Sequence, residues 1–213
     1  MIKAILWDFG GVLTTSPFEA FTRFEKEQGL PTDFIRRINS TNPDTNAWAK
    51  FERSAVTLDE FDKLFEGESG EFGHQIPGTE IIKLLAGDIR PNMVNALKIC
   101  GEKYNCTCLT NNVAAGNGPG MTRDAAAQAE VEAVMGLFRQ VIESSKVGLR
   151  KPDPRIYEYA CEQMSVAPEE VVYLDDLGIN LKPAAAMGMT TIKVVSEEQA
   201  LRDLAAASGL SFS

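Results

Sequence analysis

The stretch Ala4-Ile-Leu-Trp-Asp8-Phe-Gly-Gly-Val-Leu13 determines the fold that we expect. Four apolar residues lead directly into an aspartate and two glycines, which is typical of a buried strand that ends in a tight turn. Because ligands of α/β sheets bind beyond the carboxyl ends of the strands, Asp8 is a candidate site residue. On its own, however, an aspartate before glycines fits a structural turn equally well.

Four more apolar runs follow, and helical patterns separate them. The runs are 106–109, 140–142, 171–174 and 191–195. Apolar side chains recur at helical spacing in 91–103, 124–135, 153–164 and 180–187, and Gly188 is suited to end the last of these. This alternation predicts an α/β fold with a doubly wound parallel sheet.

The segment from residue 15 to 85 differs from the rest because aromatic residues recur in it at helical spacing, as in Phe18, Phe21 and Phe24. It has no strand signal, so we expect a helical insertion after the first strand. Residues 1–14 and 86–213 would then form the core. Within the insertion, the glycines and proline of 67–78 predict a loop.

Composition narrows the function further. The 213 residues include 30 acidic and 21 basic side chains, so the formal charge is −9 and nucleic acid or an anionic membrane is not an expected partner. The one histidine, His74, excludes a zinc site built on several histidines. There is no signal peptide pattern and no apolar stretch of about 18 residues, so we expect a cytoplasmic protein.

Two polar motifs follow later strands. In Leu109-Thr110-Asn111-Asn112, a hydroxyl and two amides could bind phosphate oxygens, or could instead cap a helix. Asp175 and Asp176 are adjacent carboxylates at a strand end, and burying such a pair usually requires a cation such as Mg²⁺. An acidic first helical turn is the simpler alternative.

The third motif is Gly148-Leu-Arg-Lys151-Pro-Asp-Pro154, in which Lys151 could direct a compact positive charge at a phosphate. A solvated basic pair is the alternative. The stretch 114–120 is rich in glycine, but it matches neither common phosphate-binding spacing and is expected to be a loop. A lone histidine is more often a packing residue, so we do not expect His74 to touch substrate.

Taken together, the motifs resemble those of the haloacid dehalogenase-like superfamily over nearly the whole chain. In that family, Asp8 would be the nucleophile, Thr110 and Lys151 would bind the phosphoryl group, and Asp176 would hold Mg²⁺. The resemblance also implies that the metal contacts Asp8 and the carbonyl of Gly10, with Asp175 and Asn180 as further candidates. Phe9, Gly10 and Asn111 would lie at the phosphate.

The resemblance also suggests a function. The insertion 15–85 looks like the helical cap of the family, and Lys151-Pro-Asp-Pro-Arg-Ile-Tyr157 is similar to the N-terminal domains of soluble epoxide hydrolases and to small sugar-phosphatases. We therefore expect a Mg²⁺-dependent phosphatase that acts on a small phosphorylated metabolite, as a monomer or homodimer. Such an enzyme would form an aspartyl-phosphate.

The chain departs from the family at Gly10, where most of its phosphatases have a second aspartate that serves as the general acid. Two other functions therefore stay open. A 2-haloacid dehalogenase also lacks that aspartate, but it needs no metal and would leave Asp175 and Asp176 without a role. A catalytically weak protein that binds a phosphorylated ligand is the other alternative, and metal-dependent turnover distinguishes the three.

Overall fold

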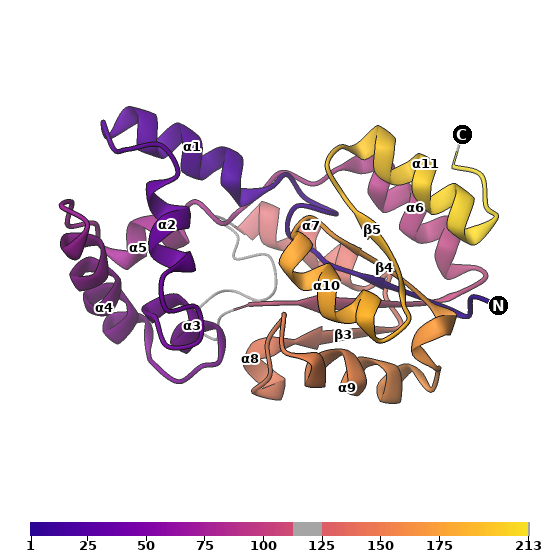
Figure 1. The fold of residues 1–213 in the computed structure, drawn as a ribbon. Helices are drawn as coiled ribbons and strands as arrows, with labels where there is room; N and C mark the ends of the chain where they lie inside the picture. Colours follow the sequence, from indigo (N-terminus) through magenta and orange to yellow (C-terminus); the bar gives the residue numbers. More distant parts are fainter. Residues whose placement is uncertain (113–124, 213) are drawn as a thin grey trace.

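Five parallel strands form the sheet of the computed structural model, which describes residues 1–112 and 125–212 (Figure 1). They are β1 (Ala4–Trp7), β2 (Asn105–Thr110), β3 (Gln140–Glu143), β4 (Val171–Asp175) and β5 (Thr190–Lys193). Their order is β3-β2-β1-β4-β5, so β1 lies between β2 and β4. The predicted doubly wound parallel sheet is confirmed, and every strand lies within two residues of its predicted range.

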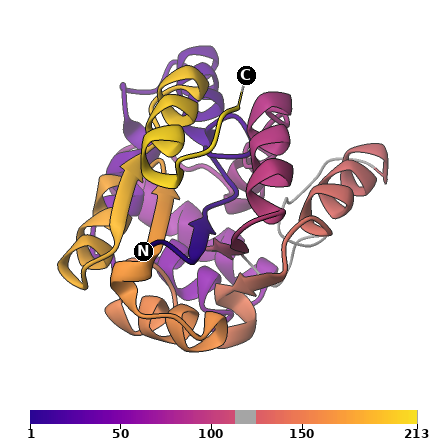
Figure 2. The same cartoon turned by 90° about the vertical axis from the view of Figure 1, so that its right-hand side faces the viewer.

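Helices cover both faces of this sheet (Figures 1 and 2). One face packs against α6 (Pro91–Gly101), α7 (Ala125–Met135) and α11 (Glu197–Ser208). The other packs against α9 (Pro154–Met164) and α10 (Gly178–Ala186). The short α8 (Ser144–Val147) follows β3, and a 3₁₀ turn (Pro168–Glu170) precedes β4.

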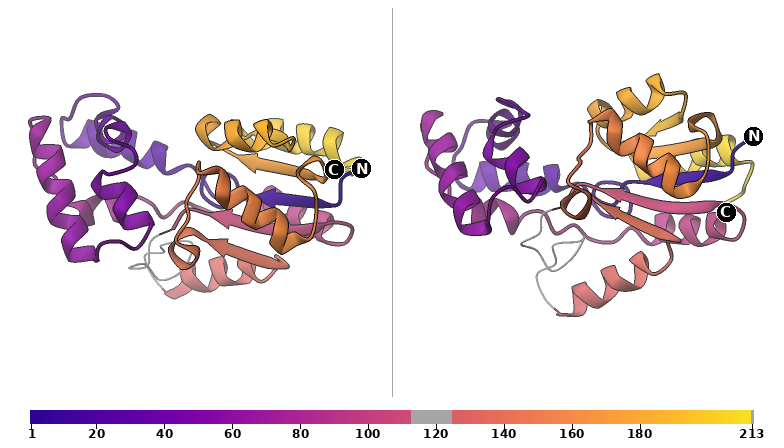
Figure 3. Two further views of the ribbon diagram at one scale, coloured as in Figure 1. Left: turned by 60° about the horizontal axis from the view of Figure 1, so that its bottom comes forward. Right: turned by 90° about the horizontal axis from the view of Figure 1, so that it is seen from below.

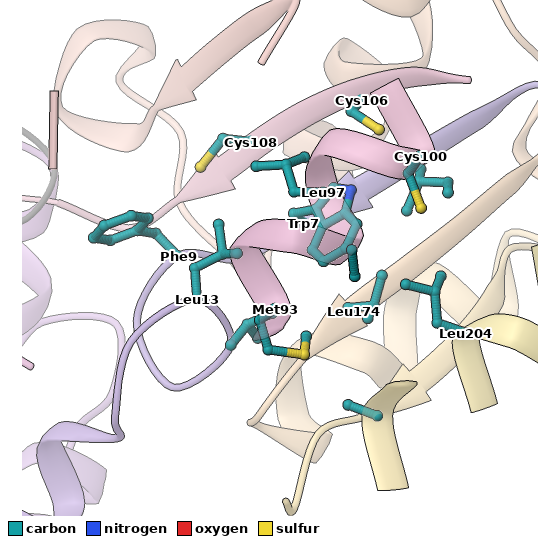
Figure 4. Close-up of a cluster of buried hydrophobic side chains, with 14 of the residues drawn as sticks. Trp7, Phe9, Leu13, Met93, Leu97, Cys100, Cys106, Cys108, Leu174 and Leu204 are labelled. Carbon is teal, nitrogen blue, oxygen red and sulfur yellow. The ribbon is translucent and has the colours of Figure 1, made fainter. Parts of the chain in front are cut away.

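Strand β1 contributes alternate side chains to the two apolar cores. Ile5 and Trp7 belong to the core beside α6 and α11, whereas Ala4 and Leu6 belong to the core beside α9. Figure 4 shows Trp7 packed among side chains from α6, β2 and β4. All four cysteines are buried thiols, as expected for the side chains of strand and helix interiors. Because both faces of β1 are covered, its apolar run is continuous rather than alternating.

Five helices lie between β1 and α6 and form a helical unit (residues 17–82) beside one end of the sheet (Figure 3). They are α1 (Pro17–Glu27), α2 (Phe34–Ser40), α3 (Ala47–Glu52), α4 (Leu58–Glu71) and α5 (Gly78–Ile82). The unit has its own apolar core, which includes Phe21, Phe51 and Phe61. Two linkers join it to the sheet, and an antiparallel β-bridge between Thr14 and Ile89 pairs one linker with the other. Across residues 1–112 and 125–212, no helix has the length and apolar character that a membrane span requires.

One expectation within this unit is wrong in part. The sequence predicts a loop over 67–78, but α4 continues through Gly67 and Gly70 as far as Glu71, and the loop covers only 72–77. Phe61, Phe65 and Ser69 of α4 are buried, so one face of the helix packs along its whole length. A glycine costs a helix only about 1 kcal/mol relative to alanine, and this packing outweighs that cost.

Candidate active site

The predicted polar residues converge at the carboxyl edge of three neighbouring strands. Asp8 follows β1, Thr110 ends β2 and Asp175 ends β4. Carboxylate oxygens of Asp8, Asp175 and Asp176 lie within 4.8 Å of one another. Parallel strands end at the same edge of a sheet, so residues 167 positions apart in the sequence become neighbours here.

Lys151 neutralises part of this negative charge. Its Nζ lies 2.9 Å from Oδ1 of Asp8 and 2.8 Å from Oδ2 of Asp175, and its side chain is 1% exposed. Burial lowers the pKa of Lys151, but the carboxylates of Asp175 and Asp8 outweigh burial and raise the pKa above its ordinary value. The lysine is therefore a buried cation that links two acidic side chains.

Asn111 holds the backbone of this lysine. Its side-chain carbonyl accepts a hydrogen bond from the N–H of Lys151 at 2.9 Å, and its amide donates to the carbonyl of Lys151 at 3.0 Å. The Lys151–Pro152 peptide bond is cis. Because both polar groups of the Asn111 side chain are engaged, we infer that it positions Lys151. Its predicted contact with phosphate stays a prediction.

Asp175 is saturated with hydrogen bonds. Its two oxygens accept from Lys151, from the hydroxyl of Tyr173, from the amide of Asn180 at 3.1 Å and from the N–H of Leu177 at 2.8 Å. A carboxylate can accept about four hydrogen bonds, so these donors occupy the acceptor positions of Asp175. The arrangement favours Asp175 and Asn180 as supports for Lys151 over their predicted role as metal ligands.

Asp176 points to the other side of the strand end, toward the loop after β1. Its Oδ2 accepts a hydrogen bond from Ser16 Oγ at 3.1 Å. Burial, with the charge of Asp175 as the next contribution, raises the pKa of Asp176 to about 6. The pKa of Asp8 is also raised, first by burial and then by Asp175 and Asp176, while Lys151 opposes the rise.

The donor set fits Mg²⁺. The three carboxylates cluster together, and the buried Lys151 pairs with only Asp8 and Asp175, which leaves an excess of negative charge that a divalent cation would balance. The oxygens of Asp8 and Asp176 are hard ligands of the kind that Mg²⁺ prefers. Asp8, Asp176 and the carbonyl of Gly10 are therefore the residues that could hold the ion.

The turn after β1 requires a glycine at residue 11. Gly11 has a φ of +74°, and a Cβ atom there would lie 2.2 Å from Oδ2 of Asp176. Apart from its chain neighbours, no atom of residues 1–112 and 125–212 lies within 4 Å of the Cβ position at Gly10. The two adjacent glycines therefore differ, because only Gly11 is required by the close approach of Asp176.

This difference gives a testable prediction. We expect Gly11→Ala to lower the free energy of unfolding by about 1–3 kcal/mol, because alanine is strained at positive φ and its methyl group would displace Asp176. Gly10→Ala is the matched control and should change stability by less than about 1 kcal/mol. Urea unfolding measures both variants, and equal losses would contradict the assignment.

The remaining sequence expectations lie away from this cluster. His74 stacks edge-to-face on Phe34 within the helical unit, with ring centroids 5.3 Å apart, which fits the expected packing role. The glycine-rich stretch 114–120 falls outside the described residues. Sequence reasoning missed Ser16, Tyr173 and the buried Glu52 of α3. In the sequence, Tyr173 is one residue of the apolar run 171–174, and nothing marks Ser16 or Glu52 as site residues.

Comparisons with known proteins identify the family of the chain. A family model for haloacid dehalogenase-like hydrolases matches residues 2–188. The chain is 31% identical over 222 residues to bifunctional epoxide hydrolase 2 of Mus musculus. The aligned region covers 99% of this chain but only 40% of that protein. It is 26% identical over 207 residues to glyceraldehyde 3-phosphate phosphatase of Methanocaldococcus jannaschii, covering 92% of this chain and 86% of that one.

A solved structure has the same fold. It is a HAD family enzyme from Bacteroides thetaiotaomicron in complex with magnesium and inorganic phosphate, with a TM-score of 0.59, 21% identity and coverage of 91% of this chain and 94% of that one. At this identity the likeness concerns the fold alone. The match of the family model, which spans most of the sequence, is the decisive finding. The chain belongs to the haloacid dehalogenase-like hydrolases, the family that its motifs resemble.

Proposed function

We propose that the protein is a Mg²⁺-dependent phosphatase that hydrolyses a small phosphomonoester, with sugar phosphates as candidate substrates, through an aspartyl-phosphate on Asp8. The placement of Asp8 carries this proposal. Its Oδ1 accepts the N–H of Phe9 at 2.7 Å and lies beside the ammonium group of Lys151. The similarity to glyceraldehyde 3-phosphate phosphatase and the magnesium and phosphate in the Bacteroides enzyme support it.

The reaction would proceed in two displacements at phosphorus. An oxygen of Asp8 forms a bond to the phosphorus atom while the bond from phosphorus to the leaving oxygen breaks, and the leaving oxygen takes up a proton from water. Water then attacks the aspartyl-phosphate, which releases inorganic phosphate and regenerates the carboxylate. Lys151 and Thr110 would bind the phosphoryl oxygens as their charge develops, with the backbone at Phe9 and Gly10 close by.

Mg²⁺ would be held by Asp8, Asp176 and the carbonyl of Gly10. When bound, it supplies positive charge that offsets the repulsion between the carboxylate and the phosphate. The helical unit (residues 17–82) would serve as a cap that excludes water and selects the leaving group. Ser16, the N-cap residue that directly precedes α1, would connect that cap to Asp176.

Removal of the metal tests the proposal. We expect the protein to hydrolyse p-nitrophenyl phosphate in the presence of Mg²⁺, to lose about 100-fold or more of this activity in EDTA, and to regain it when Mg²⁺ is restored. Release of p-nitrophenol at 405 nm, a wavelength typical of such assays, measures the rate. Turnover that is equal with and without the metal would contradict the proposal.

The same assay separates the alternatives. A 2-haloacid dehalogenase would release halide from 2-chloropropionate in EDTA, whereas a binding protein would turn over neither substrate. The chain is 33% identical over 55 residues to (S)-2-haloacid dehalogenase 1 of Pseudomonas. The assay therefore includes the dehalogenase substrate. Asp176 favours the phosphatase, because it lies beside Asp8 where it could hold a metal, and dehalogenation needs no metal.

Gly10 gives a second prediction. Because no carboxylate occupies this position, we propose substrates whose leaving group needs little protonation, such as sugar 1-phosphates or acyl phosphates. The position has room for a side chain, so Gly10→Asp should raise kcat for alkyl phosphates by about tenfold or more, below the 10²–10⁴ range typical of an evolved general acid. p-Nitrophenyl phosphate should gain little, because its leaving group is already acidic. Equal gains on both substrates, or none, would count against the idea.

A further inference from the structure

The helical unit and the sheet are joined by a buried ion pair next to the predicted active site. Glu52, the last residue of α3, contacts Arg150, with 2.5 Å between Oε2 and Nη2. Their side chains are 8% and 17% exposed. Arg150 also donates to the carbonyl of Pro43 at 3.0 Å, so one guanidinium binds two segments of the helical unit.

A second contact ties the same end of α3 to the sheet. Ser144 Oγ donates to the carbonyl of Glu52 at 3.1 Å and accepts the N–H of Asn112 at 3.0 Å. Asn112 follows β2 and Ser144 follows β3. The carboxyl terminus of α3 therefore rests on the ends of two strands whose neighbouring residues form the predicted site.

Arg150 precedes Lys151 directly, so the ion pair acts on the loop that carries the lysine. Asn111 holds the backbone of Lys151 from the β2 side, and Glu52 holds Arg150 from the helical unit. Nζ of Lys151 must stay between Asp8 and Asp175, and a shift of this loop would move it. The loop is thus fixed from both sides.

The carboxyl of Glu52 is itself in an unfavourable place. Burial raises its pKa, while Arg150 and a hydrogen bond from the side chain of Trp48 oppose the rise. A buried carboxylate is tolerated only when it is paired, and loss of one partner leaves the other uncompensated. Because its carboxylate pairs with Arg150, the side chain of Glu52 is suited to hold the two segments in position.

We propose that Glu52 is a positioning residue that, through Arg150, couples the seating of the helical unit to the placement of Lys151. The inference rests on the proposed phosphatase function as far as turnover is concerned. It also makes a structural claim that holds without turnover: the helical unit is fastened to the Lys151 loop through this pair.

The test uses Glu52→Ala, Arg150→Ala and the double variant, with Arg155→Ala in the first turn of α9 as the control. Arg155 is an exposed arginine whose partner is Asp153. Each single variant should lower kcat for p-nitrophenyl phosphate by about tenfold or more while KM changes less than about threefold, because Lys151 acts in the transition state. The double variant should be no slower than the worse single variant, as expected for residues that act as a pair. Arg155→Ala should leave the rate unchanged.

Glu52→Gln guards against misfolding because it keeps the size and hydrogen-bonding shape of the side chain. It should lower kcat less than Glu52→Ala does. In addition, amide hydrogen exchange of residues 43–54 and 144–152 should accelerate at least about tenfold in the Glu52 and Arg150 variants. A kcat within twofold of wild type in both single variants, or additive losses in the double variant, would overturn the coupling to Lys151.

The two proposals fail in different ways. If the wild-type protein hydrolyses no phosphate ester, the proposed function is wrong, and hydrogen exchange alone decides whether Glu52 fastens the helical unit. Exchange that is unchanged in every Glu52 and Arg150 variant would overturn the fastening itself. Faster exchange with normal turnover would show a tether that does not act on Lys151, and would also overturn the proposal.

Discussion

The Asp8→Asn variant is expected to lose hydrolysis of p-nitrophenyl phosphate by a factor of about 10⁴ or more. An amide cannot form the aspartyl-phosphate, because its oxygen is far less nucleophilic than a carboxylate oxygen. Phe9 and Lys151 can still donate to that oxygen, so the local structure should persist. Initial rates at saturating Mg²⁺ for the variant and wild type measure the loss.

The same substitution should not destabilise the fold. Asp8 is buried with two other carboxylates and one lysine, so its charge is poorly compensated when no metal is bound. Removal of one negative charge should leave the melting temperature unchanged or raise it, as is common for residues retained for function. Thermal unfolding of the variant and of the wild type in EDTA, where no metal is bound, measures this change in melting temperature. A variant that keeps a tenth of the wild-type rate would exclude Asp8 as the nucleophile.

The strand ends explain why much of this site could be predicted from the sequence. Asp8, Thr110 and Asp175 each follow a buried apolar run, and parallel strands end at one edge. The ends of the strands alone bring these residues together, whatever the directions of their side chains. The roles of Asp175 and Asp176 could not be separated in this way, because adjacent residues point to opposite sides and only the fold shows which one faces Lys151.

Contacts between distant segments could not be predicted from the sequence. Ser16 meets Asp176 across 160 residues, and Glu52 meets Arg150 across 98. Neither pair belongs to a periodic pattern or to a motif with fixed spacing, so only the packing of the helical unit on the sheet brings them together. The helix through Gly67 was missed for a related reason, since tertiary packing outweighed local propensity.

Lys151→Met is expected to damage both stability and activity. Methionine fills a similar volume but leaves Asp8 and Asp175 buried without their shared cation, and breaking a buried ion pair in this way costs about 3–5 kcal/mol. For a chain of this size, that corresponds to a fall of roughly 6–20 °C in melting temperature. The rate should fall by about 10²–10³ or more, because the charge on the phosphoryl oxygens loses its partner.

Lys83→Met is the matched control. Lys83 pairs with Glu80 on the surface, where the two side chains are 66% and 45% exposed, and such a pair is worth about 0–1 kcal/mol. Calorimetry of both variants in EDTA compares the buried and the exposed lysine directly. Equal shifts in melting temperature would mean that Lys151 does not compensate the carboxylates as the geometry indicates.

The double variant Lys151→Met with Asp175→Asn separates the two roles of the lysine. It removes one of the two carboxylates that the lysine neutralises, so part of the lost stability should return. Asn180 and Leu177 can still donate to the remaining carbonyl oxygen. Activity should not return, because no cation then faces the substrate phosphate. If stability and rate recovered together, Lys151 would act only by holding the fold, whereas recovery of stability alone assigns it to the chemistry.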